Sequence, residues 1–183
     1  MPGTTDMQST TATSGMQKDL HANPSEMVKE DTRSTCLLIS VDKLQLLVPR
    51  ILVAEVVDLE GITFSSSPNK DIKMFDWRDY QVPLVAASVL SPDCSTQIHR
   101  HSKIIVFHAV LNRDRLPFYA LIASTNPRLV VVSAASIVET AYENKFSALA
   151  DVLLPVVVEG EIAAIPQVHQ IEKFILESMP ARN

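Results

Sequence analysis

Two histidines separated by one residue, His99 and His101, are the most concentrated potential metal ligands in this sequence. Asp93 and Cys94 precede them and could supply further ligands. Zinc-binding pairs usually follow spacings such as C-x2–4-C or H-x3–5-H, and this pair does not. The spacing therefore favours a solvated loop. A small-ligand or metal-binding site over residues 93–101 is the alternative hypothesis.

The other reactive side chains do not form a catalytic arrangement. No G-x-S-x-G elbow surrounds a serine, and Asp76, Asp79 and Asp93 are scattered over expected loops and strand edges. Glu159 and Glu161 bracket an expected turn, where solvation explains them, rather than sharing a buried face as glycosidase carboxylates do. We therefore predict no catalytic residue, no bound metal and no cofactor, and we favour a binding module over an enzyme.

Composition excludes several other functions. The 183 residues include only 4 glycines, two of which are Gly3 and Gly15, so a glycine-rich phosphate loop cannot form. The net charge is −5 without a cluster of Lys or Arg, whereas nucleic-acid binders present a basic face. No apolar run approaches the ~20 residues of a membrane span, and no signal peptide is evident. We expect a cytoplasmic protein that binds no nucleic acid and does not insert into a membrane.

The pattern of apolar residues predicts a mainly β protein. Short apolar runs are bounded by turn residues every 8–12 positions, a spacing typical of antiparallel barrels and sandwiches. The first two runs, 36–41 and 44–48, are separated only by Asp42 and Lys43, which predicts a hairpin. About ten strands are expected. A single helix over residues 166–178 should follow, because its apolar side chains lie on one stripe.

The N-terminal region differs in composition from the remainder. Up to Arg33, Leu20 and Val28 are the only large aliphatic residues. So little apolar surface cannot offset the entropy of ordering the chain. We therefore predict a disordered tail over residues 1–34 and one domain over residues 35–178.

Two segments indicate an interaction surface. Residues 49–56 combine proline, charged and aliphatic residues, and residues 75–85 contain the only tryptophan, Trp77, next to Arg78. Trp and Arg are enriched among the residues that dominate binding energy at protein interfaces. The alternative is that Trp77 fills the end of a barrel and Arg78 is merely solvated.

The first segment resembles a motif of the CheW family, the adaptor domains that couple chemoreceptors to the CheA histidine kinase. In that family a hairpin is followed by the pattern P-x-x-x-V-x-E-I/V. Pro49, Val53, Glu55 and Val56 match this pattern in register.

The second segment resembles the family motif N-L-R-G, which precedes a strand. Arg78 and Pro83 keep the spacing of the family's Arg and Pro. Asp76, Trp77 and Asp79 replace the Asn, Leu and Gly of that motif. A different receptor, or none, is therefore an open alternative.

The resemblance covers about residues 35–176 and implies a mainly β fold. Two small SH3-like five-stranded β-barrels would pack together around a shared core, with a C-terminal α-helix. The family acts in two-component signal transduction without performing chemistry. The resemblance thus implies an adaptor or scaffold that bridges the CheW-like regulatory domain of a CheA-like histidine kinase and the cytoplasmic tip of a chemoreceptor.

The resemblance also assigns the partner-binding residues, which are expected to be Val53, Glu55, Val56, Trp77 and Arg78. Val53 and Glu55 would lie at the kinase contact, and Arg78 would lie near both partner surfaces. We expect Val53→Asp or Glu55→Arg to weaken kinase binding without unfolding the protein.

A narrower assignment follows from the segment around Trp77 and from the long N-terminal region. Both are most similar to ChpC-type members of the family. Those members belong to chemosensory systems that control type IV pili and twitching motility, so the resemblance implies a role in such a system.

Overall fold

The structure, a computed structural model, describes residues 33–139 and 152–179. The predicted tail, residues 1–34, lies outside the described residues except for Arg33 and Ser34, which begin the first strand. The strand expected over residues 137–142 is described only as far as Glu139. Within the described residues, no helix combines the length and the apolar composition needed to cross a bilayer.

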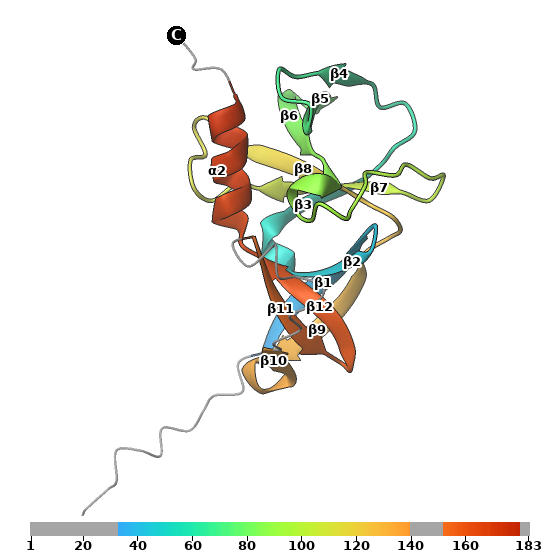
Figure 1. Cartoon of the computed structure of the whole chain (residues 1–183), viewed down its shortest axis with the longest axis vertical. Coiled ribbons are helices and arrows are strands. Elements are labelled where there is room, and N and C mark those ends of the chain that lie inside the picture. The colour runs from blue at the N-terminus through green and yellow to red at the C-terminus, as the bar shows by residue number, and fades with distance from the viewer. Residues whose placement is uncertain (1–32, 140–151, 180–183) are drawn as a thin grey trace, which may run out of the picture. The chain divides into compact units, whose positions relative to one another are not determined.

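The described residues form twelve strands, three short 3-10 helices and one α-helix (Figure 1). The strands are β1 (Arg33–Val41), β2 (Leu44–Pro49), β3 (Val53–Asp58), β4 (Phe64–Ser66), β5 (Ile72–Trp77), β6 (Tyr80–Val85), β7 (Lys103–His108), β8 (Phe118–Ala123), β9 (Arg128–Ser133), β10 (Ile137–Glu139), β11 (Leu153–Val158) and β12 (Glu161–Pro166). The helices are η1 (Arg50–Leu52), η2 (Ala87–Val89), η3 (Ala134–Ser136) and α2 (Val168–Ser178).

The strands form two six-stranded sheets. The order is β10-β11-β12-β2-β1-β9 in the first, here called the β1 sheet, and β3-β7-β8-β6-β5-β4 in the second, the β8 sheet. The mainly β class and the C-terminal helix are thus confirmed, while each sheet has six strands where five were expected. Among the described residues, no hydrogen-bonded ladder joins the two end strands of either sheet.

The additional strands lie partly where a loop was expected, over residues 61–73. The serines and the proline of that segment are typical turn residues and therefore predicted a loop. The strand found there, β4, is only three residues long. β4 exists because Phe64 pairs with Phe75 of β5 across the ladder and packs edge-to-face on it, with ring centroids 6.1 Å apart. Short edge strands of this kind are defined by their partner rather than by their own sequence.

The two sheets repeat one order of strands. Each starts with an edge strand beside an antiparallel hairpin, which is β9 beside β1–β2 in the first and β3 beside β7–β8 in the second. A parallel pair then joins each hairpin to the rest of its sheet: β2 with β12, and β8 with β6. The chain therefore crosses between the sheets after β2 and again after β8.

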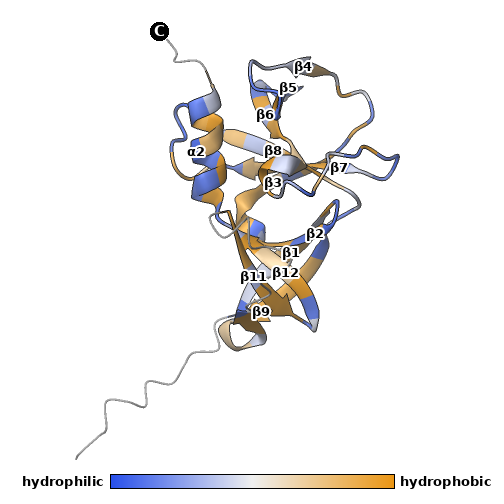
Figure 2. Ribbon diagram, viewed as in Figure 1, coloured by the Kyte–Doolittle hydropathy of each residue, from blue (hydrophilic) through white to orange (hydrophobic). Residues whose placement is uncertain are grey.

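The buried apolar residues form three clusters. One lies within the β1 sheet and one within the β8 sheet. The third and largest is shared, with Leu46 from one sheet, Ile105 from the other, and Ile171 and Ile175 from α2. Figure 2 shows apolar residues along the strands and on part of α2, with polar residues concentrated in the connections. The shared core implied by the resemblance is therefore present.

Two predicted hairpins are confirmed. β1 and β2 pair around Asp42 and Lys43, as the break between the apolar runs indicated. β11 and β12 pair around Glu159 and Gly160, whose φ angles of 51° and 80° are those of a tight type I′ turn. In both hairpins, two turn residues connect strands that pair without a register shift.

Tyr119 is buried in the shared core, where its ring stacks on Phe107 with centroids 5.1 Å apart. Burial raises the pKa of the Tyr119 hydroxyl, and the negative charge of Glu172 raises it further. The unfolded chain releases this proton near the ordinary tyrosine pKa of about 10, whereas the folded chain keeps it. Because the folded state then binds more protons, the free energy of unfolding must fall as the pH rises above about 10.

We therefore expect Tyr119→Phe to lose less stability than the unchanged chain between about pH 9 and 11, by at most about 1.4 kcal/mol per pH unit. Urea unfolding followed by circular dichroism at both pH values measures this difference. Tyr80→Phe is the matched control, because Tyr80 is exposed, and it should behave like the unchanged chain. Equal losses in all three proteins would contradict the assignment of the effect to Tyr119.

Candidate functional site

The first predicted segment lies on β3, whose side chains reach three different environments. A bulge shifts the register with β7, so that Val53 lies opposite Phe107 while Glu55 lies opposite Val106. Val53 is only 4% exposed and belongs to the shared core. Val56 is 40% exposed, and Glu55 is half-buried. Glu55 and Val56 are therefore available for contact, and Val53 can influence a partner only through the position of β3.

The second predicted segment forms the turn between β5 and β6. Trp77 and Tyr80 are the last pair of this hairpin, and Arg78 and Asp79 connect them. Arg78 has a φ of 52°, a left-handed conformation that costs an L-residue roughly 1–2 kcal/mol. This conformation places the Arg78 guanidinium over the indole ring, 4.6 Å from its centroid. Trp77 itself is buried, as the barrel-end interpretation expects.

The two segments meet at the Glu55 carboxylate. Trp77 Nε1 donates a hydrogen bond to Glu55 Oε2 over 3.0 Å, and Arg78 Nη2 donates to the same oxygen over 2.9 Å. The structure thus brings together three residues that the sequence placed in separate motifs. Arg78 is paired with a carboxylate instead of being merely solvated. An ion pair this exposed contributes only about 0–1 kcal/mol, so its main effect is to fix the geometry of the turn against β3.

An aromatic cluster, which the sequence did not indicate, extends this site. Phe118 contacts Trp77 and Tyr80 edge-to-face, with both centroid distances at 4.9 Å. His108 lies 5.4 Å from the Phe118 ring on the neighbouring strand. Because β6 and β8 come together only through their parallel pairing, no local pattern could have placed Tyr80 on Phe118. Tyr80 remains exposed, so the cluster has a solvent-facing edge beside Arg78.

The predicted histidine loop has a different arrangement from a metal site. Cys94 is buried, while Asp93, His99 and His101 are exposed. The loop is tied to the β1–β2 turn, where Asp42 accepts a hydrogen bond from the Ser95 amide over 2.9 Å. Among residues 33–139 and 152–179, no three His, Cys, Asp or Glu side chains converge on a possible metal position. The loop therefore offers a structural role, and the metal-binding alternative gains no support.

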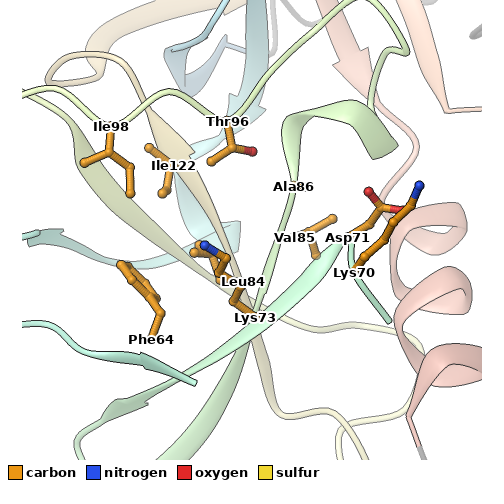
Figure 3. A pocket seen from close by; sticks show the side chains of 10 residues that line it. All are labelled: Phe64, Lys70, Asp71, Lys73, Leu84, Val85, Ala86, Thr96, Ile98 and Ile122. Atoms are coloured by element: carbon orange, nitrogen blue, oxygen red, sulfur yellow. The ribbon is translucent and has the colours of Figure 1, made fainter. Parts of the chain in front are cut away.

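A small cavity of about 90 Å³ opens between β4, β5, β6 and β8 (Figure 3). Phe64, Leu84 and Ile122 give it an apolar wall. Its oxygen-bearing side chains are already engaged: Thr96 Oγ1 accepts the Ala87 amide over 2.8 Å, and Asp71 Oδ1 accepts the Ser88 hydroxyl over 3.1 Å. Lys70 and Lys73 also line the cavity, so its apolar wall is bordered by two amino groups.

Comparison with known proteins identifies the fold. No protein-family model matches the sequence, and no curated protein matches it either. The structure is similar to that of the scaffolding protein TtCheW from Thermoanaerobacter tengcongensis, with a TM-score of 0.63 and 13% sequence identity. The similarity covers 81% of this chain and 98% of that chain. The fold is therefore CheW-like.

Proposed function

We propose that this chain is a non-catalytic adaptor that couples a CheA-like histidine kinase to chemoreceptors from the cytoplasm. A single domain over about residues 35–178 would carry this function. The main support is the convergence of Glu55, Trp77 and Arg78 at the edge of the β8 sheet, on a fold similar to that of a scaffolding protein. The sequence resemblance assigns the same three residues to partner binding.

The adaptor function would depend on an edge strand, β3, and on the Glu55–Arg78 ion pair beside it. Among the described residues, β3 pairs on one side only and exposes Val56. An exposed strand edge can accept a second protein, and nearby charges then fix the orientation of the partner. The Glu55–Arg78 pair would supply such a charge pattern next to the aromatic edge at Tyr80.

The choice of signalling system is a narrower proposal. The Trp77–Arg78–Asp79 sequence, together with the long N-terminal region, favours a ChpC-type adaptor of a type IV pilus chemosensory system. Because these residues replace the usual family motif, the receptor partner would differ from that of other members. Binding assays against the chemosensory kinase and receptor encoded beside this chain would identify both partners.

Isothermal titration calorimetry tests the adaptor proposal directly. We expect the full chain to bind the CheW-like regulatory domain of the kinase with a Kd below about 100 μM. No heat of binding up to that concentration, with both proteins folded, would contradict the proposal.

Glu55→Arg is expected to weaken this binding at least about ten-fold, equivalent to 1.4 kcal/mol. The substitution removes the acceptor of two hydrogen bonds and places a second cation beside Arg78. Glu55→Gln is the matched control, because its amide oxygen can still accept the Trp77 indole proton and it introduces no charge. If both variants bind the kinase domain with the Kd of the unchanged chain, the interface does not include Glu55.

A further inference from the structure

The connection between β7 and β8 breaks the repeat of the two sheets. The equivalent hairpin, β1–β2, turns through Asp42 and Lys43 alone, whereas residues 109–117 separate His108 from Phe118. The two sheets also differ after the equivalent strands β12 and β6. The helix α2 follows β12, whereas only the short η2 follows β6. Figure 1 shows the 109–117 loop beside α2. The two additions to the repeat are therefore neighbours.

A buried carboxylate joins these two additions. Glu172 of α2 is fully buried, and its Oε1 accepts the Val110 amide over 2.9 Å. Its Oε2 accepts the Leu111 amide over 2.6 Å. Burying a carboxylate is costly unless hydrogen bonds replace its hydration. These charge-assisted bonds do so, and they fix the backbone of two consecutive residues.

The rest of the loop is held from within. Arg113 Nε donates to the Ala109 carbonyl over 2.9 Å, and the Leu116 amide donates to the Asn112 carbonyl over 2.8 Å. The Asn112 side chain also accepts the Arg115 amide over 3.1 Å. The loop is thus ordered along its length before any partner arrives.

This ordered loop presents apolar side chains to solvent. Val110 and Leu111 are 47% and 54% exposed, although their own backbone amides are held by a buried group. Arg113 and Arg115 are exposed nearby, against one acidic residue, Asp114. Ordering the backbone beneath exposed aliphatic side chains does not bury any apolar surface in water. The same ordering lowers the entropy cost of binding when those side chains enter an interface.

The loop is continuous with the candidate site. His108 immediately precedes it and lies against Phe118, which contacts Tyr80 and Trp77. A line of side-chain contacts therefore leads from the Glu55–Arg78 pair to the base of the loop. The charge of Arg78 is already balanced by Glu55, whereas the loop adds two exposed arginines against one aspartate in a chain whose net charge is −5.

We propose that Val110 and Leu111, positioned by Glu172, form a second part of the same partner-binding surface. They would contact an apolar patch edged by carboxylates on the kinase regulatory domain. This inference rests on the proposed adaptor function. It adds a contact that neither sequence motif contains.

Leu111→Asp is the direct test, with Ile98→Asp as its matched control. Ile98 is 52% exposed on a different loop, so the two variants introduce the same charge at nearly the same exposure. In calorimetry of the full chain with the kinase regulatory domain, we expect Leu111→Asp to raise the Kd at least about ten-fold and Ile98→Asp to change it less than about two-fold. An unchanged Kd for Leu111→Asp, while the unchanged chain binds, would overturn this inference alone.

Other outcomes separate this inference from the proposed function. If the unchanged chain does not bind the kinase domain, the adaptor function fails and the inference fails with it. If sedimentation shows that Leu111→Asp abolishes self-association without changing the kinase Kd, the loop contacts a second copy of this chain and the inference is wrong.

A double-mutant cycle tests the positioning role of Glu172. Glu172→Gln keeps one oxygen that can accept a loop amide but loses the charge. We expect it to raise the Kd roughly three- to ten-fold when Leu111 is present, and to raise it clearly less in the Leu111→Asp background, where only Val110 remains to be positioned. Circular dichroism should show every variant folded at the temperature of the titration. Additive losses of affinity would mean that Glu172 does not act through Leu111.

Discussion

Val53→Asp is expected to unfold the protein, whereas Val56→Asp on the same strand is expected to leave it folded and to weaken partner binding. Val53 is 4% exposed in the core shared by both sheets and α2, so an aspartate there would be an unpaired buried charge. Such substitutions cost more than about 4 kcal/mol, a large part of the 5–15 kcal/mol that stabilises a typical domain. This result would replace the sequence-based expectation that Val53→Asp spares the fold.

Thermal unfolding by circular dichroism measures the first half of this prediction. We expect the cooperative transition of Val53→Asp to be lost or strongly shifted to lower temperature, while that of Val56→Asp stays close to the original. Calorimetry with the kinase domain then measures the second half, in which Val56→Asp should bind more weakly. A folded Val53→Asp variant with unchanged stability would show that β3 does not pack as described.

Trp77→Ala should be the next most damaging substitution, with a loss of about 3–5 kcal/mol in the free energy of unfolding. The indole is 7% exposed, packs edge-to-face on Phe118 and donates to Glu55, so its removal leaves a cavity and takes away one of the two donors to the carboxylate. Trp77→Phe should lose less, because it keeps an aromatic ring and gives up mainly the hydrogen bond, worth about 1 kcal/mol.

Tyr80→Ala is the matched control for the tryptophan, since Tyr80 contacts the same Phe118 ring but is 45% exposed. We expect it to cost less than about 1.5 kcal/mol. Urea unfolding followed by far-ultraviolet circular dichroism is the appropriate measurement, because Trp77 is the only tryptophan and its fluorescence disappears with it. Equal losses for Trp77→Ala and Tyr80→Ala would contradict the burial of the indole.

Several parts of the fold could be predicted from the sequence because they depend on near neighbours. The β1–β2 hairpin follows from two apolar runs around Asp42 and Lys43, and the β11–β12 hairpin follows from the turn residues Glu159 and Gly160. The apolar stripe of α2 predicted a helix with one buried side, and Ile171 and Ile175 are indeed buried. The mainly β class follows from the same local spacing of runs and turns.

The candidate site was only partly predictable. Glu55, Trp77 and Arg78 were singled out by residue type and by family resemblance, but their common hydrogen-bonded carboxylate was not. Nor did the sequence show that Val53 lies in the shared core while Val56 is exposed, or that a bulge shifts the register between Val53 and Glu55. A one-residue bulge changes which face a side chain occupies, and no propensity scale indicates it.

Sequence by itself determined the local elements of this protein, since turns, alternation and helical stripes are fixed by residues within a few positions of one another. Tertiary structure alone decided the crossing of the chain between sheets, the edge-to-face contact of Tyr80 with Phe118 and the burial of Glu172 under the 109–117 loop. Each of these joins strands or helices that are distant in the chain. Their energy comes from pairing and burial that exist only once both sheets have formed around their shared core.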